Sequence, residues 1–176
     1  DEEPPPDPEP VEDLVDDFDD GEINAELWPR VFGVAAEEDG KLTAVALASG
    51  VASGVESVAK YTLAGSQISV QMTPPSAEDS DWAVAAVSLW DAPGGYETFI
   101  RVWRDSVLVE GAQGIGIYAA VGGIEAINGV YDVEVPGSAD WVRLREDDGT
   151  LYLDVSANGI TWSVLDSWET PAGIAG

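Results

Sequence analysis

The stretch that decides the fold is WVRLREDDGTLYLDVSANGITWSVL, residues 141–165, which has the pattern of three consecutive β-strands. Apolar residues alternate in it with polar or charged ones, and a period of two is typical of strands that bury one face. Two dipeptides interrupt the alternation, Asp148-Gly149 and Asn158-Gly159. Such pairs supply the positive φ of tight hairpin turns. The stretch therefore predicts an antiparallel meander.

The alternation also assigns side chains to the two faces of the meander, because successive side chains of a strand point in opposite directions. The inward set, expected in the core, is Val142, Leu144, Leu151, Leu153, Val155, Ile160, Trp162 and Val164. The outward set is Trp141, Arg143, Arg145, Tyr152 and Asp154.

Short β-type segments continue upstream to residue 14, broken by Gly, Asp, Asn or Pro about every 8 to 12 residues. The expected strands are 41–48, 58–64, 66–72, 82–90, 96–103, 106–110, 114–121, 129–135, 141–146, 150–156 and 160–167. No helical period stands out. Many short strands with frequent turns predict an all-β fold, a two-sheet antiparallel sandwich.

The first residues have a different composition. The stretch DEEPPPDPEPVED, residues 1–13, holds five of the eleven prolines. Proline favours the extended polyproline II conformation and neighbouring carboxylates repel one another, so we expect an extended acidic linker. The alternative is an arm that docks on another part of an assembly. Residues 14–176 are expected to form one β domain, and the start at Asp1 suggests a piece of a longer parent protein.

Composition excludes several classes of function. Histidine and cysteine are absent, which removes the commonest general base, the Ser-His-Asp triad and thiolate chemistry. The net charge of -27 disfavours nucleic acid and anionic membranes, which both need Lys and Arg. No apolar run of about 18 residues is present to span a bilayer, and the acidic, proline-rich first residues differ from the basic-then-apolar order of a signal peptide. These features predict a domain that is not an enzyme.

Four motifs occur in a recognisable order: VDDFDDGEINAELW (15–28), EEDGKLTAV (37–45), KYTLAGSQISVQM (60–72) and the meander at 141–165. Together they resemble the concanavalin A-like lectin/glucanase jelly roll, in particular its laminin-G-like branch. The resemblance implies a jelly-roll sandwich of the kind carried by bacterial surface proteins and by minor tail proteins, fibres and capsid appendages of tailed phages. The Ala-, Val- and Gly-rich composition also resembles actinobacteriophage products.

In that family one more strand usually follows the last hairpin, whereas this chain stops at PAGIAG, residues 171–176. The resemblance thus implies a C-terminal continuation, or a strand supplied by a neighbouring chain that would cover an open sheet edge.

Two groups of carboxylates were candidates for chemistry. Glycosidases on this fold use Glu-x-Asp-x-Glu along one strand; Asp132 and Glu134 offer only two carboxylates, so a solvated strand face is favoured over catalysis. Calcium accepts several oxygen ligands in flexible geometry, and Asp17, Asp19 and Asp20 are candidate ligands. The alternative for this second group is a polar first strand followed by a turn.

A ligand face is the third candidate. It combines aromatic and charged side chains that are expected on one sheet face: Arg101, Trp103, Trp141, Arg143, Arg145, Tyr152 and Asp154. Aromatic rings flanked by charges suit a sugar or peptide groove. The alternative is a cross-strand ladder of Arg with carboxylates, with the aromatic rings packed on a neighbour. The remaining aromatic residues, expected in the core or at its rim, are Phe18, Trp28, Trp82, Trp90 and Trp162.

These observations lead to the expectation of a non-enzymatic structural or adhesive module of a virion or cell surface, with weak glycan binding. Its partners would be other copies or other surface proteins, met through the N-terminal arm and a sheet edge. The alternative is a carbohydrate-binding module of a larger secreted glycan-active enzyme. No cofactor is expected apart from calcium.

Overall fold

The computed structural model describes residues 14–45, 52–57, 61–73, 84–90, 97–105, 113–133 and 140–174. Contacts divide the chain into two compact units, 1–62 and 63–176, which are described separately. The predicted arm at 1–13 and the predicted strand at 106–110 lie outside the described residues. The expectation of a single domain over 14–176 stays a prediction.

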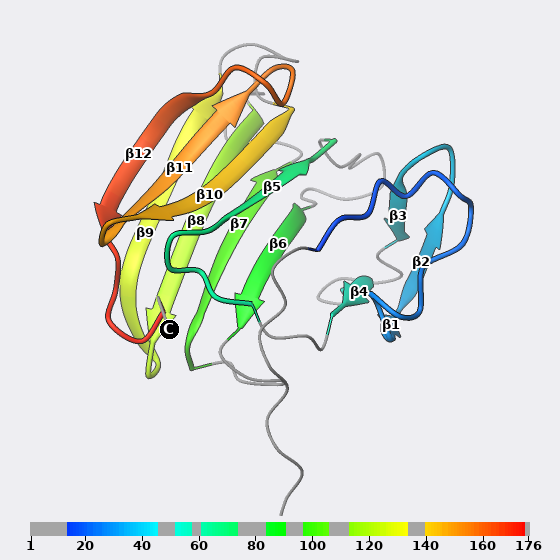
Figure 1. The fold of residues 1–176 in the computed structure, drawn as a ribbon, viewed down its shortest axis with the longest axis horizontal. Helices are drawn as coiled ribbons and strands as arrows, with labels where there is room; N and C mark the ends of the chain where they lie inside the picture. The colour runs from blue at the N-terminus through cyan, green and yellow to red at the C-terminus, as the bar shows by residue number, and fades with distance from the viewer. Residues whose placement is uncertain are drawn as a thin grey trace, which may run out of the picture. The chain divides into compact units, whose positions relative to one another are not determined.

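The larger unit consists of two four-stranded antiparallel sheets that face each other (Figure 1). One sheet, in the order β12-β11-β10-β5, contains β5 (Gln67–Gln71), β10 (Trp141–Asp147), β11 (Thr150–Ser156) and β12 (Ser163–Glu169). The other, in the order β6-β7-β8-β9, contains β6 (Val84–Trp90), β7 (Phe99–Asp105), β8 (Gln113–Val121) and β9 (Ile124–Val133). The described residues include no helix, so the predicted all-β antiparallel sandwich is confirmed.

The core lies between these two sheets. Its most buried side chains alternate along the central strands and are Ile100, Val102, Ile115, Ile117, Ala119, Val142, Leu144, Leu151 and Leu153. Each large apolar side chain buried in this way contributes about 1.5 to 3 kcal/mol to folding. The inward assignment is confirmed for Val142, Leu144, Leu151 and Leu153, and Val155 packs against the same cluster.

The Asp148-Gly149 turn is confirmed. Both residues have positive φ, 47° and 79°, and the flanking residues Asp147 and Thr150 pair as the last partners of β10 and β11. Glu146 supports the turn from the inner face, because its carboxylate accepts a hydrogen bond from the Gly149 N–H at 2.7 Å and a short one from the Gly65 N–H. Both bonds lower the pKa of Glu146, and the bond from Gly65 has the larger effect.

The predicted tight turn at Asn158-Gly159 is wrong. β11 ends at Ser156 and β12 begins only at Ser163, and the Asn158 Oδ1 accepts hydrogen bonds from the N–H groups of residues 160 and 161, each 2.9 Å long. The side chain thereby closes a wider loop, 157–162. A tight Asn-Gly turn would have extended the ladder through these residues.

The inward assignments of Ile160, Trp162 and Val164 are also wrong. Ile160 is 82% exposed and Val164 is exposed as well, while Trp162 lies against Arg143 on the outer face. A bulge where Leu153 and Asp154 pair with β12 shifts the register, so that Leu165 packs on the core in place of Val164. Trp168, which lies beyond the bulge, packs there as well. One extra residue in a strand exchanges the two faces beyond it.

Two polar contacts tie the sheets together. At one edge the Tyr131 hydroxyl of β9 donates to Asp166 of β12 at 2.5 Å. Burial, helped by this bond, raises the pKa of Tyr131 to about 12. Elsewhere Arg104 of β7 is buried and donates to the Met72 carbonyl at 2.9 Å, with Asp140 at 3.5 Å.

The smaller unit contains two two-stranded antiparallel sheets. β1 (Arg30–Phe32) pairs with β4 (Gly54–Glu56), and β2 (Val34–Glu37) pairs with β3 (Leu42–Val45). β3 confirms part of the predicted strand 41–48, whereas β1, β2 and β4 were not predicted. Residues 61–64, the described part of the predicted strand 58–64, form no strand.

Candidate functional site

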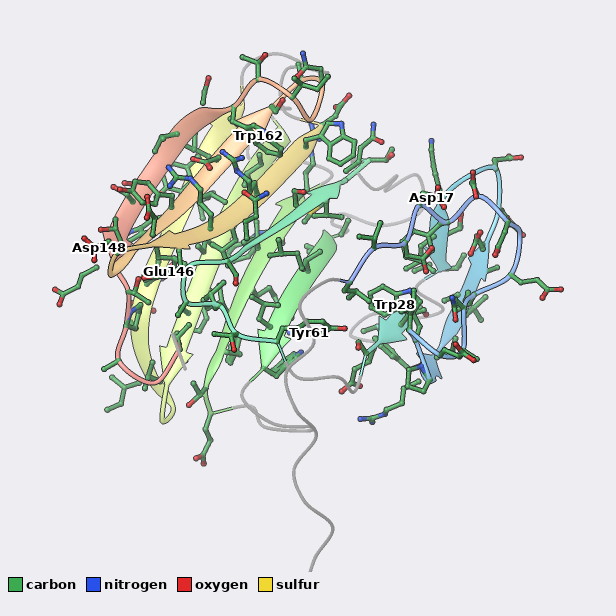
Figure 2. The ribbon with its side chains drawn as sticks, viewed as in Figure 1. Asp17, Trp28, Tyr61, Glu146, Asp148 and Trp162 are labelled. Atoms are coloured by element: carbon green, nitrogen blue, oxygen red, sulfur yellow. The ribbon has the colours of Figure 1, made fainter. Side chains whose placement is uncertain are left out.

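The outer face of the sheet β12-β11-β10-β5 carries the densest group of charged and aromatic side chains predicted as a site. We call it the arginine–aromatic face; it consists of Trp141, Arg143, Arg145, Tyr152, Asp154 and Trp162. The strand register brings these residues together, since Arg143 lies opposite Asp154 and Arg145 lies opposite Tyr152. Trp162 lies at one end of this sheet and Asp148 at the other (Figure 2).

Asp154 is the centre of this face. It is only 1% exposed, although it points outward from the sheet. Its Oδ2 accepts hydrogen bonds from the Nε groups of Arg143 and Arg145, 2.8 and 2.9 Å long, and lies 2.7 Å from the Nη2 of Arg143. Charge-assisted bonds of this kind are roughly twice as strong as neutral ones. One buried carboxylate therefore holds two guanidinium groups in place.

Each guanidinium also lies on an aromatic ring. The Arg143 Cζ is 4.2 Å from the Trp162 ring centroid, and the Arg145 Cζ is 3.7 Å from that of Tyr152. Both distances are within the range of cation–π attraction. The rings cover Asp154 from solvent together with the two arginines, which are themselves only 17% and 25% exposed.

The loop 157–162 is held close to this face. A Cβ added at Gly159 would come within 3.0 Å of the Trp141 indole, so the loop backbone passes directly over that ring. A side chain at residue 159 would push the loop away, and glycine adopts its φ of 69° more readily than residues with a side chain. The close approach explains how the loop presents Trp162 to Arg143.

The face carries more positive than negative charge at its centre. Two guanidinium groups share Asp154, and the next carboxylate, Asp147, is 73% exposed and 3.8 Å from Arg145. Within the described residues the Arg145 Nη2 makes no hydrogen bond, and the Arg143 Nη1 makes a long one, 3.5 Å, to Gln67. Terminal N–H groups are thus left to bind an acceptor from outside.

Arg101 and Trp103 were predicted on the same sheet face, and this is wrong. Both lie on β7, in the other sheet, and their neighbours Ile100, Val102 and Arg104 are the residues of β7 that point into the core. Strand parity correctly assigns Arg101 and Trp103 outward. It does not say to which sheet a strand belongs, so the seven predicted residues divide between opposite sides of the sandwich.

The second outer face is an aromatic one. Rings of Trp90 and Phe99 lie 5.0 Å apart and those of Phe99 and Tyr118 lie 5.6 Å apart. Arg101 lies 5.5 Å from the Trp90 ring and donates from Nε to Ser88 at 3.0 Å. We call this group the aromatic face. Phe99 and Tyr118 were missed as site residues, although Phe99 has the same parity as Arg101.

Trp103 continues this face along β7. Its indole lies on Gly116 of β8, where an added Cβ would overlap with the ring. A glycine in the middle of a strand often marks such a close approach. The Trp103 ring is thus seated on the backbone of the neighbouring strand.

The predicted calcium ligands lie in the smaller unit. Residues 14–19 form no strand, and the carboxylate of Asp16 accepts a hydrogen bond from Trp28 Nε1 at 2.6 Å. The negative charge of Asp17 raises the pKa of Asp19. Among the described residues no three Asp, Glu, His or Cys side chains form a group that could hold a metal ion. Calcium at Asp17, Asp19 and Asp20 stays a prediction.

The structure describes only one residue of the predicted carboxylate pair, Asp132 and Glu134. Asp132 belongs to β9, opposite Gly114, and Glu134 lies outside the described residues.

Comparison of the chain with protein-family models finds no match, and comparisons with curated proteins and with solved structures find none either. The resemblance to the concanavalin A-like jelly roll stays a prediction. In the part of the chain that the structure describes, no helix is long and apolar enough to cross a membrane.

Proposed function

We propose that this chain is a non-enzymatic structural or adhesive module of a virion or cell surface, and specifically of a phage tail or capsid appendage. The observation that carries the proposal is the pair of faces on opposite sides of one sandwich, the arginine–aromatic face and the aromatic face with its single Arg101. Protein interfaces are enriched in Trp, Tyr, Phe and Arg, and these residues dominate their binding energy. Two such faces suit a module that contacts neighbours on both sides. The motif resemblance supports the virion setting.

The state of association tests this proposal. Sedimentation velocity of the chain over a wide concentration range is expected to show a defined oligomer or reversible association. Charge repulsion opposes association, because the chain carries a net charge of -27. The experiment is therefore made at about 0.15 M salt, where the Debye length is about 8 Å. A monomer at all concentrations contradicts the proposal.

The alternative is a carbohydrate-binding module of a larger secreted enzyme. It is favoured by the aromatic face, because neighbouring rings such as Trp90, Phe99 and Tyr118 offer apolar platforms and Arg101 a hydrogen-bond donor. A glycan array with Trp103→Ala and Trp141→Ala compares the two faces. Binding lost in only one variant identifies the face that holds the sugar, and no binding by the parent chain contradicts this function.

A further inference from the structure

We propose that the arginine–aromatic face binds residues 1–13 of a second copy of this chain. The inference rests on the proposed function, since it names a surface through which neighbouring copies would meet. It is carried by the match between the chemistry of this face and that of the segment.

The segment is acidic and rich in proline. The sequence DEEPPPDPEPVED contains seven carboxylates and five prolines. Proline-rich segments populate polyproline II before binding, and they are recognised by surfaces lined with aromatic rings. Carboxylates are recognised by arginine, whose planar fork of N–H donors fits both oxygens. A partner for this segment therefore needs arginines and aromatic rings side by side.

The arginine–aromatic face meets this requirement. Arg143 and Arg145 lie two residues apart on β10, and the rings of Trp141, Trp162 and Tyr152 lie next to them. Asp154 fixes both guanidinium groups through Nε, so little side-chain freedom is lost when a ligand binds. Their terminal N–H groups remain as donors. Above the buried Asp154, an incoming carboxylate would compete with the exposed Asp147, at 3.8 Å from Arg145, and with the long Gln67 contact of Arg143 at 3.5 Å.

The other arginines of the described residues are placed less well for this role. Arg30 pairs with Glu56 at 3.1 Å, and Arg104 is buried in the sandwich. Arg101 lies singly between two rings of the aromatic face. The adjacent pair on β10 is the stronger attractor in a chain whose net charge is -27.

A paramagnetic tag tests the inference directly on the full chain. The protein has no cysteine, so Asp1→Cys creates a unique attachment site. Unlabelled chains with the tag are mixed with isotope-labelled chains without it, at about 1 mM because each exposed ion pair strengthens association only about 1.5- to 5-fold. Only contacts between copies can then broaden the observed signals.

The expected result is selective broadening of the indole N–H signals of Trp141 and Trp162. The indole signals of Trp90 and Trp103, on the opposite sheet, serve as internal controls and should keep their intensity. Broadening of the control signals alone, of all indoles equally, or of none overturns the inference. A second arrangement places the tag on the labelled chains and dilutes them with unlabelled ones; broadening seen only there shows docking within one chain and also overturns it.

A charge-neutral segment is the matched variant. Replacing the carboxylates of residues 2–13 by their amides, Asp→Asn and Glu→Gln, leaves both faces and the prolines unchanged. The intermolecular broadening should fall at least about fivefold, because the ion pairs are lost. Undiminished broadening contradicts the charge match. Self-association in sedimentation without any effect on Trp141 and Trp162 would reject this inference and leave the proposed function standing, whereas a monomer without broadening would reject both.

Discussion

Asp154→Asn is the sharpest test of how the arginine–aromatic face is held together. The substitution keeps the shape of the side chain but removes its charge. Two hydrogen bonds from Nε groups and a third guanidinium contact converge on one oxygen of Asp154. The other oxygen, Oδ1, is buried and has no hydrogen-bond partner among the residues that the structure describes. An amide placed there can direct its oxygen to the arginines. Its NH2 group would then occupy the buried Oδ1 position, and the negative charge that both guanidinium groups share would be gone.

The magnitude follows from these contacts. Removing one partner of a fully buried ion pair costs about 3 to 5 kcal/mol. Arg143 and Arg145 retain contact with solvent, 17% and 25% of their side-chain surface, so they can be rehydrated in part. We therefore expect a loss of about 2 to 3 kcal/mol in the free energy of unfolding. In a chain of this size this corresponds to a melting temperature lower by about 4 to 12 °C.

Urea unfolding followed by tryptophan fluorescence measures this loss. The matched control is Asp147→Asn, because Asp147 also faces Arg145 but is 73% exposed and 3.8 Å away. A surface change of this kind is expected to stay within about 0.5 kcal/mol of the parent. If Asp154→Asn is as stable as the control, the buried carboxylate does not hold the face together and the reasoning is refuted.

Three further predictions concern the sandwich. Gly116→Ala should lose about 1 to 3 kcal/mol in urea unfolding, because the new methyl group overlaps with the Trp103 indole; unchanged stability would contradict that contact. Tyr131→Phe should lose about 1 kcal/mol with its bond to Asp166. The raised pKa of Tyr131, about 12 in the folded chain, also predicts that the parent loses stability as the pH rises from about 10 to about 12, and that Tyr131→Phe lacks this loss in unfolding measured across that range. For Glu146 the lowered folded pKa predicts a contribution that is present above the unfolded pKa of about 4.3 and lost as the pH falls through the folded value. The difference in free energy of unfolding between the parent chain and Glu146→Gln should therefore become smaller as the pH falls. A difference that does not depend on pH would contradict the lowered pKa of Glu146.

The sequence predicts the hairpin of β10 and β11 correctly because its signals are local. Period-two alternation and the Asp148-Gly149 turn act within a few residues, and the observed register follows from them. The prediction of a tight hairpin between β11 and β12 is wrong for an equally local reason. The side chain of Asn158 bonds to the backbone ahead of it, and a bulge beside Asp154 moves Leu165 into the core. Neither feature has a clear signature in the residue pattern.

The candidate site could be predicted in its parts but not as a whole. Parity places Arg101, Trp103, Arg143 and Arg145 outward, as observed. Membership of a sheet depends on which distant strands pair, and alternation within one strand carries no such information. This is why one predicted face became two, whereas the parity of Phe99 within β7 could have placed it beside Arg101.

A side chain that points outward from a strand is not necessarily accessible to solvent, and Asp154 shows why. The pleat directs its side chain away from the core, yet the long side chains of Arg143 and Arg145 fold over it, and Trp162 and Tyr152 cover the arginines in turn. These side chains form a layer over the outer surface of the sheet, and they shield Asp154 although they extend outward from the strands. N–H donors of the two arginines therefore remain at the outer surface of this layer, while the carboxylate of Asp154 lies beneath them. A face built in this order attracts acidic groups in a protein that would otherwise repel them, and this is the physical basis for a contact between an acidic segment and another copy of the chain.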